Sequence, residues 1–72
     1  MNAPSEMNHE DVLRVRLQVL KREHGDLDAA IEALHQSVNP DQLTLKRLKF
    51  RKLKLKDEIA RIEDELTPDI IA

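Results

Sequence analysis

The sequence predicts an all-α fold, an antiparallel two-helix coiled-coil hairpin that assembles further into a helical bundle. Apolar residues recur at alternating steps of three and four along two long stretches, which is the spacing of coiled-coil seams. One strong break, "SVNPDQL" at residues 37–43, separates these stretches. Charged residues make up 36% of the 72-residue chain, which has one glycine, one aromatic residue and no cysteine. Such a composition is typical of long helices and excludes a disulfide framework.

The first helix is expected at about residues 9–37. Asn8 is a suitable N-cap, and Glu10 and Asp11 suit the positive end of the helix dipole. The apolar spacing continues to the end of this stretch. Its seam consists of Leu13, Leu17, Leu20, His24, Leu27, Ile31, Leu34 and Val38.

The second helix is expected at about residues 40–66, after a turn at residues 38–40. Asn39 is the predicted N-cap, with Pro40 at the first helical position and Gln42 as its capping-box partner. Val38 and Leu43 flank this cap at the spacing of a hydrophobic staple.

The end of the second helix is expected near Leu66, because Thr67 precedes a proline and is biased away from helical angles. The seam of this helix consists of Leu45, Leu48, Lys52, Leu55, Ile59, Ile62 and Leu66. The predicted organisation is therefore a tail at residues 1–8, a hairpin at residues 9–66 and a second tail at residues 67–72.

The two seams match layer by layer when the short connection returns the chain antiparallel. The predicted layers are Leu34 with Leu45, Ile31 with Leu48, Leu27 with Lys52, His24 with Leu55, Leu20 with Ile59, Leu17 with Ile62, and Leu13 with Leu66. Because the whole set agrees on one register, the hairpin is the central prediction.

Charge is segregated along the chain, with seven Lys or Arg residues among positions 46–56. In this register, much of the basic stretch lies level with acidic residues of the first helix, and flanking charges select the register of antiparallel coils. The predicted neighbours are Arg51 with Glu23 and Asp28, Lys49 with Asp28, Arg47 with Glu32, and Arg14 and Arg16 with Glu63, Asp64 and Glu65.

Nucleic-acid binding is the alternative explanation of the basic stretch. The candidate contacts are Lys46, Arg47, Lys54 and Lys56, since pairing with the first helix does not use all of them. The sequence pI of 5.9 and the presence of a single aromatic residue, Phe50, argue against a typical nucleic-acid binder.

Two polar residues, His24 and Lys52, occupy seam positions where leucine would be more stabilising. We interpret them as determinants of register, with both side chains reaching out of the seam toward Asp28. A pH switch based on His24 is the alternative. We expect no metal or cofactor, because His9, His24 and His35 lack the spacing of a shared site.

Apolar residues outside the seam predict an association surface. They are Val12, Val15 and Val19 on the first helix, and Leu43, Phe50 and Leu53 on the second. Such stripes mark interaction sites. We therefore expect a non-enzymatic interaction module that forms a homo-oligomer, most simply a dimer, or binds a partner protein helix, and takes no small-molecule substrate. On this hypothesis, Phe50→Asp weakens assembly.

We expect no association with membranes. No apolar run approaches the ~20 residues that span a bilayer. The start of the chain, "MNAPSEMNHED", lacks the basic and apolar regions of a secretory signal, which predicts a cytoplasmic protein.

Two segments carry a resemblance to a known family. The first is "HGDLDAAI", with His24, Leu27 and Asp28, and the second is "KLKLKDEI", from Lys52 to Ile59, preceded by Lys49. The chain resembles, over about residues 10–66, the YdcH-like family of small bacterial proteins of unknown function. The resemblance implies a helical hairpin and no assigned enzyme activity.

Overall fold

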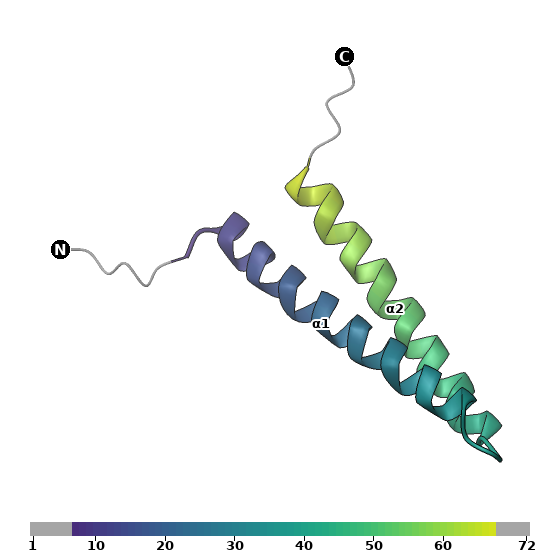
Figure 1. Cartoon of the computed structure of the whole chain (residues 1–72). Helices are drawn as coiled ribbons and strands as arrows, with labels where there is room; N and C mark the ends of the chain where they lie inside the picture. The colour runs from purple at the N-terminus through teal and green to yellow at the C-terminus, as the bar shows by residue number, and fades with distance from the viewer. Residues whose placement is uncertain (1–6, 68–72) are drawn as a thin grey trace.

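The computed structural model describes residues 7–67 and has two helices, α1 (His9–His35) and α2 (Gln42–Leu66), with no strand among those residues. The helices run antiparallel, lie together at the corner and diverge toward their free ends (Figure 1). The predicted all-α hairpin is therefore confirmed. Of the two predicted tails, residues 1–6 and 68–72 lie outside the described part of the chain.

The N-terminus of α1 is capped as predicted. The side-chain oxygen of Asn8 accepts a hydrogen bond from the backbone N–H of Asp11 at 2.8 Å. This bond satisfies one of the backbone donors that lack a partner in the first helical turn. The other end of α1 comes two residues earlier than expected, at His35, where the Ser37 hydroxyl donates to the Leu34 carbonyl at 2.8 Å.

The N-cap of α2 is Asp41, and the prediction of Asn39 was wrong. One Asp41 carboxylate oxygen accepts from the N–H groups of Leu43 and Thr44 at 3.0 and 3.4 Å, and the other accepts from the Thr44 hydroxyl at 2.9 Å. Asn and Asp are comparable caps, and at this position the charged carboxylate also interacts favourably with the positive end of the helix dipole. These bonds, the one from the Thr44 hydroxyl foremost, lower the pKa of Asp41 below its usual value.

Val38 departs from both roles that its spacing predicted. Because α1 ends at His35, Val38 lies in the corner and its relative exposure is 102%. It therefore extends no seam, and it forms no hydrophobic staple with Leu43, which is itself exposed.

The core is the single layer of side chains between the helices. Its buried members are Leu20, Ile31, Leu45, Leu55 and Ile62, and the half-buried residues packed along the same seam are Leu13, Leu17, Leu27, Ile59 and Leu66. All ten were predicted as seam residues. No described side chain is completely enclosed, because two helices cover each other on one side only. The outer face of each helix is therefore free to carry function.

Candidate interaction surfaces

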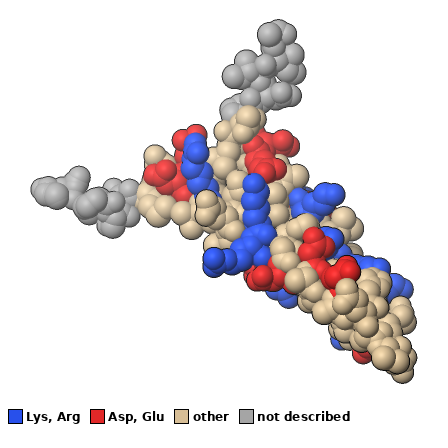
Figure 2. Space-filling view, in the orientation of Figure 1, with Lys and Arg blue, Asp and Glu red and all other residues tan. Residues whose placement is uncertain are grey.

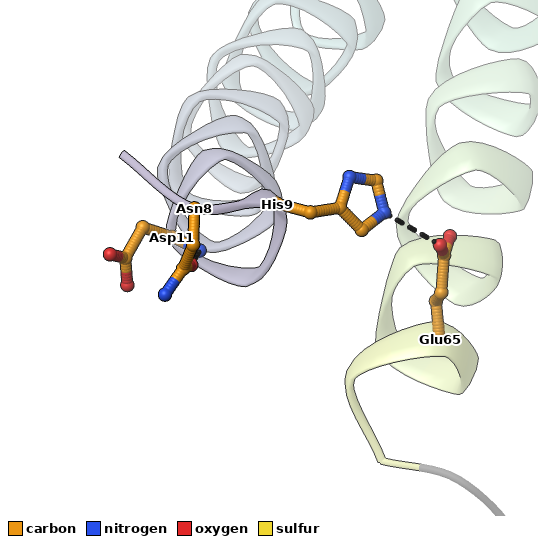
Figure 3. Close-up of polar contacts among 4 residues, drawn as sticks. All are labelled: Asn8, His9, Asp11 and Glu65. Carbon is orange, nitrogen blue, oxygen red and sulfur yellow. Dashed lines mark hydrogen bonds and ion pairs between the residues drawn. The ribbon is translucent and has the colours of Figure 1, made fainter. Parts of the chain in front are cut away.

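Three polar contacts join the helices in their open half. Arg16 pairs with Glu58 at 2.7 Å and Lys21 pairs with Glu63 at 3.2 Å. At the end of the hairpin, the His9 imidazole points across to α2 and contacts Glu65 at 3.0 Å (Figure 3). These contacts lie on both sides of the seam and fit the predicted antiparallel register. All of their side chains are between 42% and 75% exposed, so each contact contributes only about 0.2–1 kcal/mol.

The predicted charge pairing of the basic stretch was largely wrong. Among the described residues, Lys52 is the only one of its seven cations within ion-pair distance of an acid, the carboxylate of Asp28. Arg51 and Glu23 line a shared shallow groove without forming an ion pair. Arg16 pairs with Glu58 instead of the expected residues 63–65. Two charged residues at the same height along the hairpin do not form an ion pair when one of them lies on the outer side of its helix, because that side does not face the partner helix.

The basic stretch consequently presents six cations to solvent. They are Lys46, Arg47, Lys49, Arg51, Lys54 and Lys56, all of them exposed. Figure 2 shows Lys and Arg side chains along the outer edge of α2 in its half next to the corner. The Lys54 ammonium lies 5.4 Å from the centroid of the Phe50 ring, which is a cation–π distance. Of the four nucleic-acid candidates Lys46, Arg47, Lys54 and Lys56, Lys54 therefore lies against an exposed aromatic ring, with Lys46 and Arg47 one turn before that ring on the same helix.

Lys52 leaves the seam as predicted and pairs with Asp28. Its side chain is 34% exposed, so the aliphatic part packs along the seam while the ammonium reaches the edge. The hydrogen bond from Lys52 is the largest cause that lowers the pKa of Asp28, and the charges of Lys52 and His24 lower it further. The ion pair therefore holds the Asp28 carboxylate at the edge of the seam, beside the layer that contains Lys52.

His24 does not reach out of the seam, and that part of the prediction was wrong. Its Nε2 atom is buried and has no hydrogen-bond partner among the described residues. A buried polar atom without a partner costs about 1–3 kcal/mol. His24 therefore lowers the stability of its layer, and its role in specifying the register stays a prediction.

The six predicted association residues are all exposed. The relative exposures of Val12, Val15, Val19, Leu43, Phe50 and Leu53 lie between 47% and 60%. They form two surfaces, however, instead of one. The valines lie in the open half of α1, whereas the other three lie in the corner half of α2, and each set faces away from the opposite helix.

The valines belong to a longer row that the sequence analysis recognised only in part. We call it the outer row of α1, and it comprises Val12, Val15, Val19, Arg22, Asp26, Ala29 and Ala33. Every member is exposed, and the steps alternate between three and four as they do in the seam. The same spacing could have revealed the complete row, but alanines and charges carry little hydrophobic signal.

A groove of about 640 Å³ opens where the helices diverge, between Leu17 of α1 and Leu66 of α2. Charged residues border it, among them Arg14, Lys21 and Glu63. No group of three or more His, Cys, Asp or Glu residues within the described chain could hold a metal ion. Neither described helix is long and apolar enough to cross a membrane.

Comparison with known proteins places the chain in a family. No curated protein and no solved structure matches it significantly. A family model described as "Protein of unknown function (DUF465)" matches residues 17–63. That segment runs from the third turn of α1 to the last turn of α2, and it includes the corner and both segments of the YdcH-like resemblance, which is thereby confirmed. The chain belongs to the DUF465 family of proteins of unknown function.

Proposed function

We propose that this protein is a non-enzymatic helical-hairpin module that acts by association, most simply with a second copy of itself. The observation that carries this proposal is the exposure of six large apolar side chains in two separate stripes. Single exposed apolar residues are ordinary, whereas stripes at helical spacing are typical of interaction surfaces. The core is one layer thick, so a second layer would also bury surface that the hairpin alone leaves exposed.

Sedimentation velocity over a wide range of protein concentrations tests self-association directly. The expected result is a discrete oligomer, with dimer favoured, whose population rises with concentration. A monomer at the highest concentration, together with unchanged helix content by circular dichroism, would contradict self-association. The chain would then require a helix from another protein.

The exposed cations of the basic stretch favour a second candidate function, the binding of RNA or DNA. Lys54 lies over the Phe50 ring, Lys46 and Arg47 lie one helical turn before it, and no carboxylate of the described chain lies within ion-pair distance of these three residues or of Lys56. Phosphate contacts of this kind lose affinity steeply with salt.

A titration of labelled mixed-sequence RNA at about 50 and about 200 mM salt tests this second function. Binding that weakens at the higher salt and is lost in Lys46→Glu/Lys54→Glu supports it. Val38→Thr is the matched control, since Val38 is fully exposed in the corner, belongs to neither stripe, and the change alters no charge. Absence of binding at the lower salt rules the candidate out.

A further inference from the structure

We infer that a second copy of this chain docks on the outer row of α1, antiparallel and about a two-fold axis near residue 24. This inference rests on the proposed self-association and specifies its geometry. The row faces away from α2, all of its members are exposed, and its spacing of three and four residues is that of a seam without a partner. A homodimer across a two-fold axis needs a surface that complements itself.

The outer row complements itself in one antiparallel register. Val19 meets Ala29 of the second copy, Val15 meets Ala33, and Arg22 meets Asp26. By symmetry each layer occurs twice. Large residues thus face small ones in the apolar layers, and opposite charges meet in the two central layers. Shifting the register by one heptad in one direction keeps one apolar layer, Val12 with Ala29, but places Val15 opposite Asp26 and Val19 opposite Arg22.

The charge blocks of α1 favour the same arrangement. Residues 14–22 contain four cations, Arg14, Arg16, Lys21 and Arg22, and no acid. Residues 23–34 contain four acids, Glu23, Asp26, Asp28 and Glu32, and no lysine or arginine. An antiparallel pair centred near residue 24 sets the basic block of each copy against the acidic block of the other. Arg16, Lys21 and Asp28 already pair with α2, so Arg22 and Asp26 carry most of this attraction. A parallel pair would set like charges together.

Arg22 and Asp26 are available for this contact. Both are exposed, and neither has an ion-pair partner within the described chain. Gly25 lies beside the proposed axis, where a residue without a side chain permits close approach. Inside one hairpin nothing requires it, since an added Cβ would meet no atom within 4 Å. The one pair of like charges in the proposed dimer is Glu23 with Glu23 of the second copy. Arg22 lies next to Glu23 in each chain.

The geometry also changes the expected role of Phe50. It lies on α2, away from the outer row of α1, so the dimer leaves it exposed. Phe50→Asp was expected to weaken assembly when the two stripes were regarded as one surface. In this arrangement Phe50→Asp is a control that leaves the dimer intact.

A charge-reversal experiment tests the register. In a homodimer of Arg22→Asp, an aspartate faces Asp26 of the other copy in both central layers. In a homodimer of Asp26→Arg, an arginine faces Arg22 of the other copy in both central layers. Each variant is expected to raise the dimer Kd about tenfold or more at low salt, because two pairs change from attraction to repulsion. An equimolar mixture of the two variants restores both pairs, so it is expected to dimerise nearly as well as the wild type.

The readout is sedimentation velocity of each variant, the mixture and Phe50→Asp, with circular dichroism confirming equal helix content. Unchanged dimerisation of both single variants, or a mixture that associates no better than its components, overturns the inference. Loss of the dimer in Phe50→Asp alone also overturns it and leaves self-association standing through α2. A wild-type chain that is monomeric throughout contradicts the proposed self-association itself.

Discussion

The outer faces of α1 and α2 each expose three large apolar side chains, but the charges around them differ. On α1 the valines continue into a row whose neighbouring charges form one basic and one acidic block. On α2 a comparable row, with Phe50 and Leu53 at its centre, runs through residues 46–56, where every charged residue is a cation, and reaches its first acid at Asp57. An antiparallel pairing of Phe50 with Leu53 of a second copy would set Arg47 against Lys54 and Lys49 against Lys56.

This difference shows that apolar exposure does not by itself identify a self-association surface. Charge decides what each face can bind, because like charges in contact oppose the burial of the apolar residues between them. In the proposed register the face of α1 is complementary to itself, whereas the proposed partner of the α2 face is a polyanion or an acidic protein.

Loss of the seam has the largest expected effect, because both faces depend on it. Leu20→Ala removes a buried side chain from the core and should lower the free energy of unfolding by about 2–4 kcal/mol. Chemical denaturation followed by circular dichroism measures the change. Val38→Ala is the matched control, since Val38 is fully exposed, and a similar loss in both variants would contradict the assignment of the core.

Two matched substitutions to aspartate, one on each helix, test whether only the outer face of α1 takes part in assembly. Val15→Asp places a carboxylate in an apolar layer of the proposed dimer and should raise its Kd at least about tenfold. Leu53→Asp changes an equally exposed residue of α2 and should leave the Kd within about threefold of the wild type. Sedimentation velocity of both variants measures the difference. Equal weakening would mean that both faces take part in assembly.

Replacing His24 in the seam separates the stability of the hairpin from the affinity of its outer faces. His24→Leu removes the buried Nε2 atom that lacks a partner and should raise the free energy of unfolding by about 1–2 kcal/mol. The dimer Kd should not change, because His24 lies in the seam between α1 and α2. Thermal unfolding at several protein concentrations separates the two quantities. A destabilised His24→Leu would mean that the imidazole contributes favourable contacts in its layer.

The smallest expected effect is the pH dependence of the corner that starts α2. The folded-state pKa of Asp41 is lower than its unfolded value of about 3.9, so its carboxylate stabilises the folded state above that value. This stabilisation is lost as the pH falls through the folded-state pKa. Asp41→Asn keeps an acceptor at the cap but does not titrate, and the melting temperature should fall less below pH 4 in this variant. Identical acid profiles would contradict a role for the cap carboxylate.

The seam residues were predictable from sequence because burial between two helices imposes a strict period. Ten of them, from Leu13 to Leu66, lie buried or half-buried between the helices as predicted. The corner was less predictable, since Asn39 and Asp41 are both good caps and only the path of the chain decides between them. Val38 could continue the spacing of α1 only if the helix continued, and it does not.

The surfaces were only partly predictable. Exposure of Val15 and Phe50 followed from their position outside the seam, but their separation on two faces required the three-dimensional arrangement. The expected ion pairs of the basic stretch do not form because most of its side chains point away from α1, and height along the hairpin axis does not reveal this direction. Ala29 and Ala33 carry little apolar signal, so the full outer row emerged only when its exposed members were placed on one helix face.

The most direct test of the α1–α1 dimer is an isotope-filtered NOE measurement on an equimolar mixture of ¹³C-labelled and unlabelled protein. Val19 and Ala29 are ten positions apart on one helix, about 15 Å along its axis, which is too far for an NOE within one chain. The account predicts NOEs between the Val19 methyls of one copy and the Ala29 methyl of the other, with the corresponding pair at Val15 and Ala33. Intermolecular NOEs confined to Phe50 and Leu53 would contradict it.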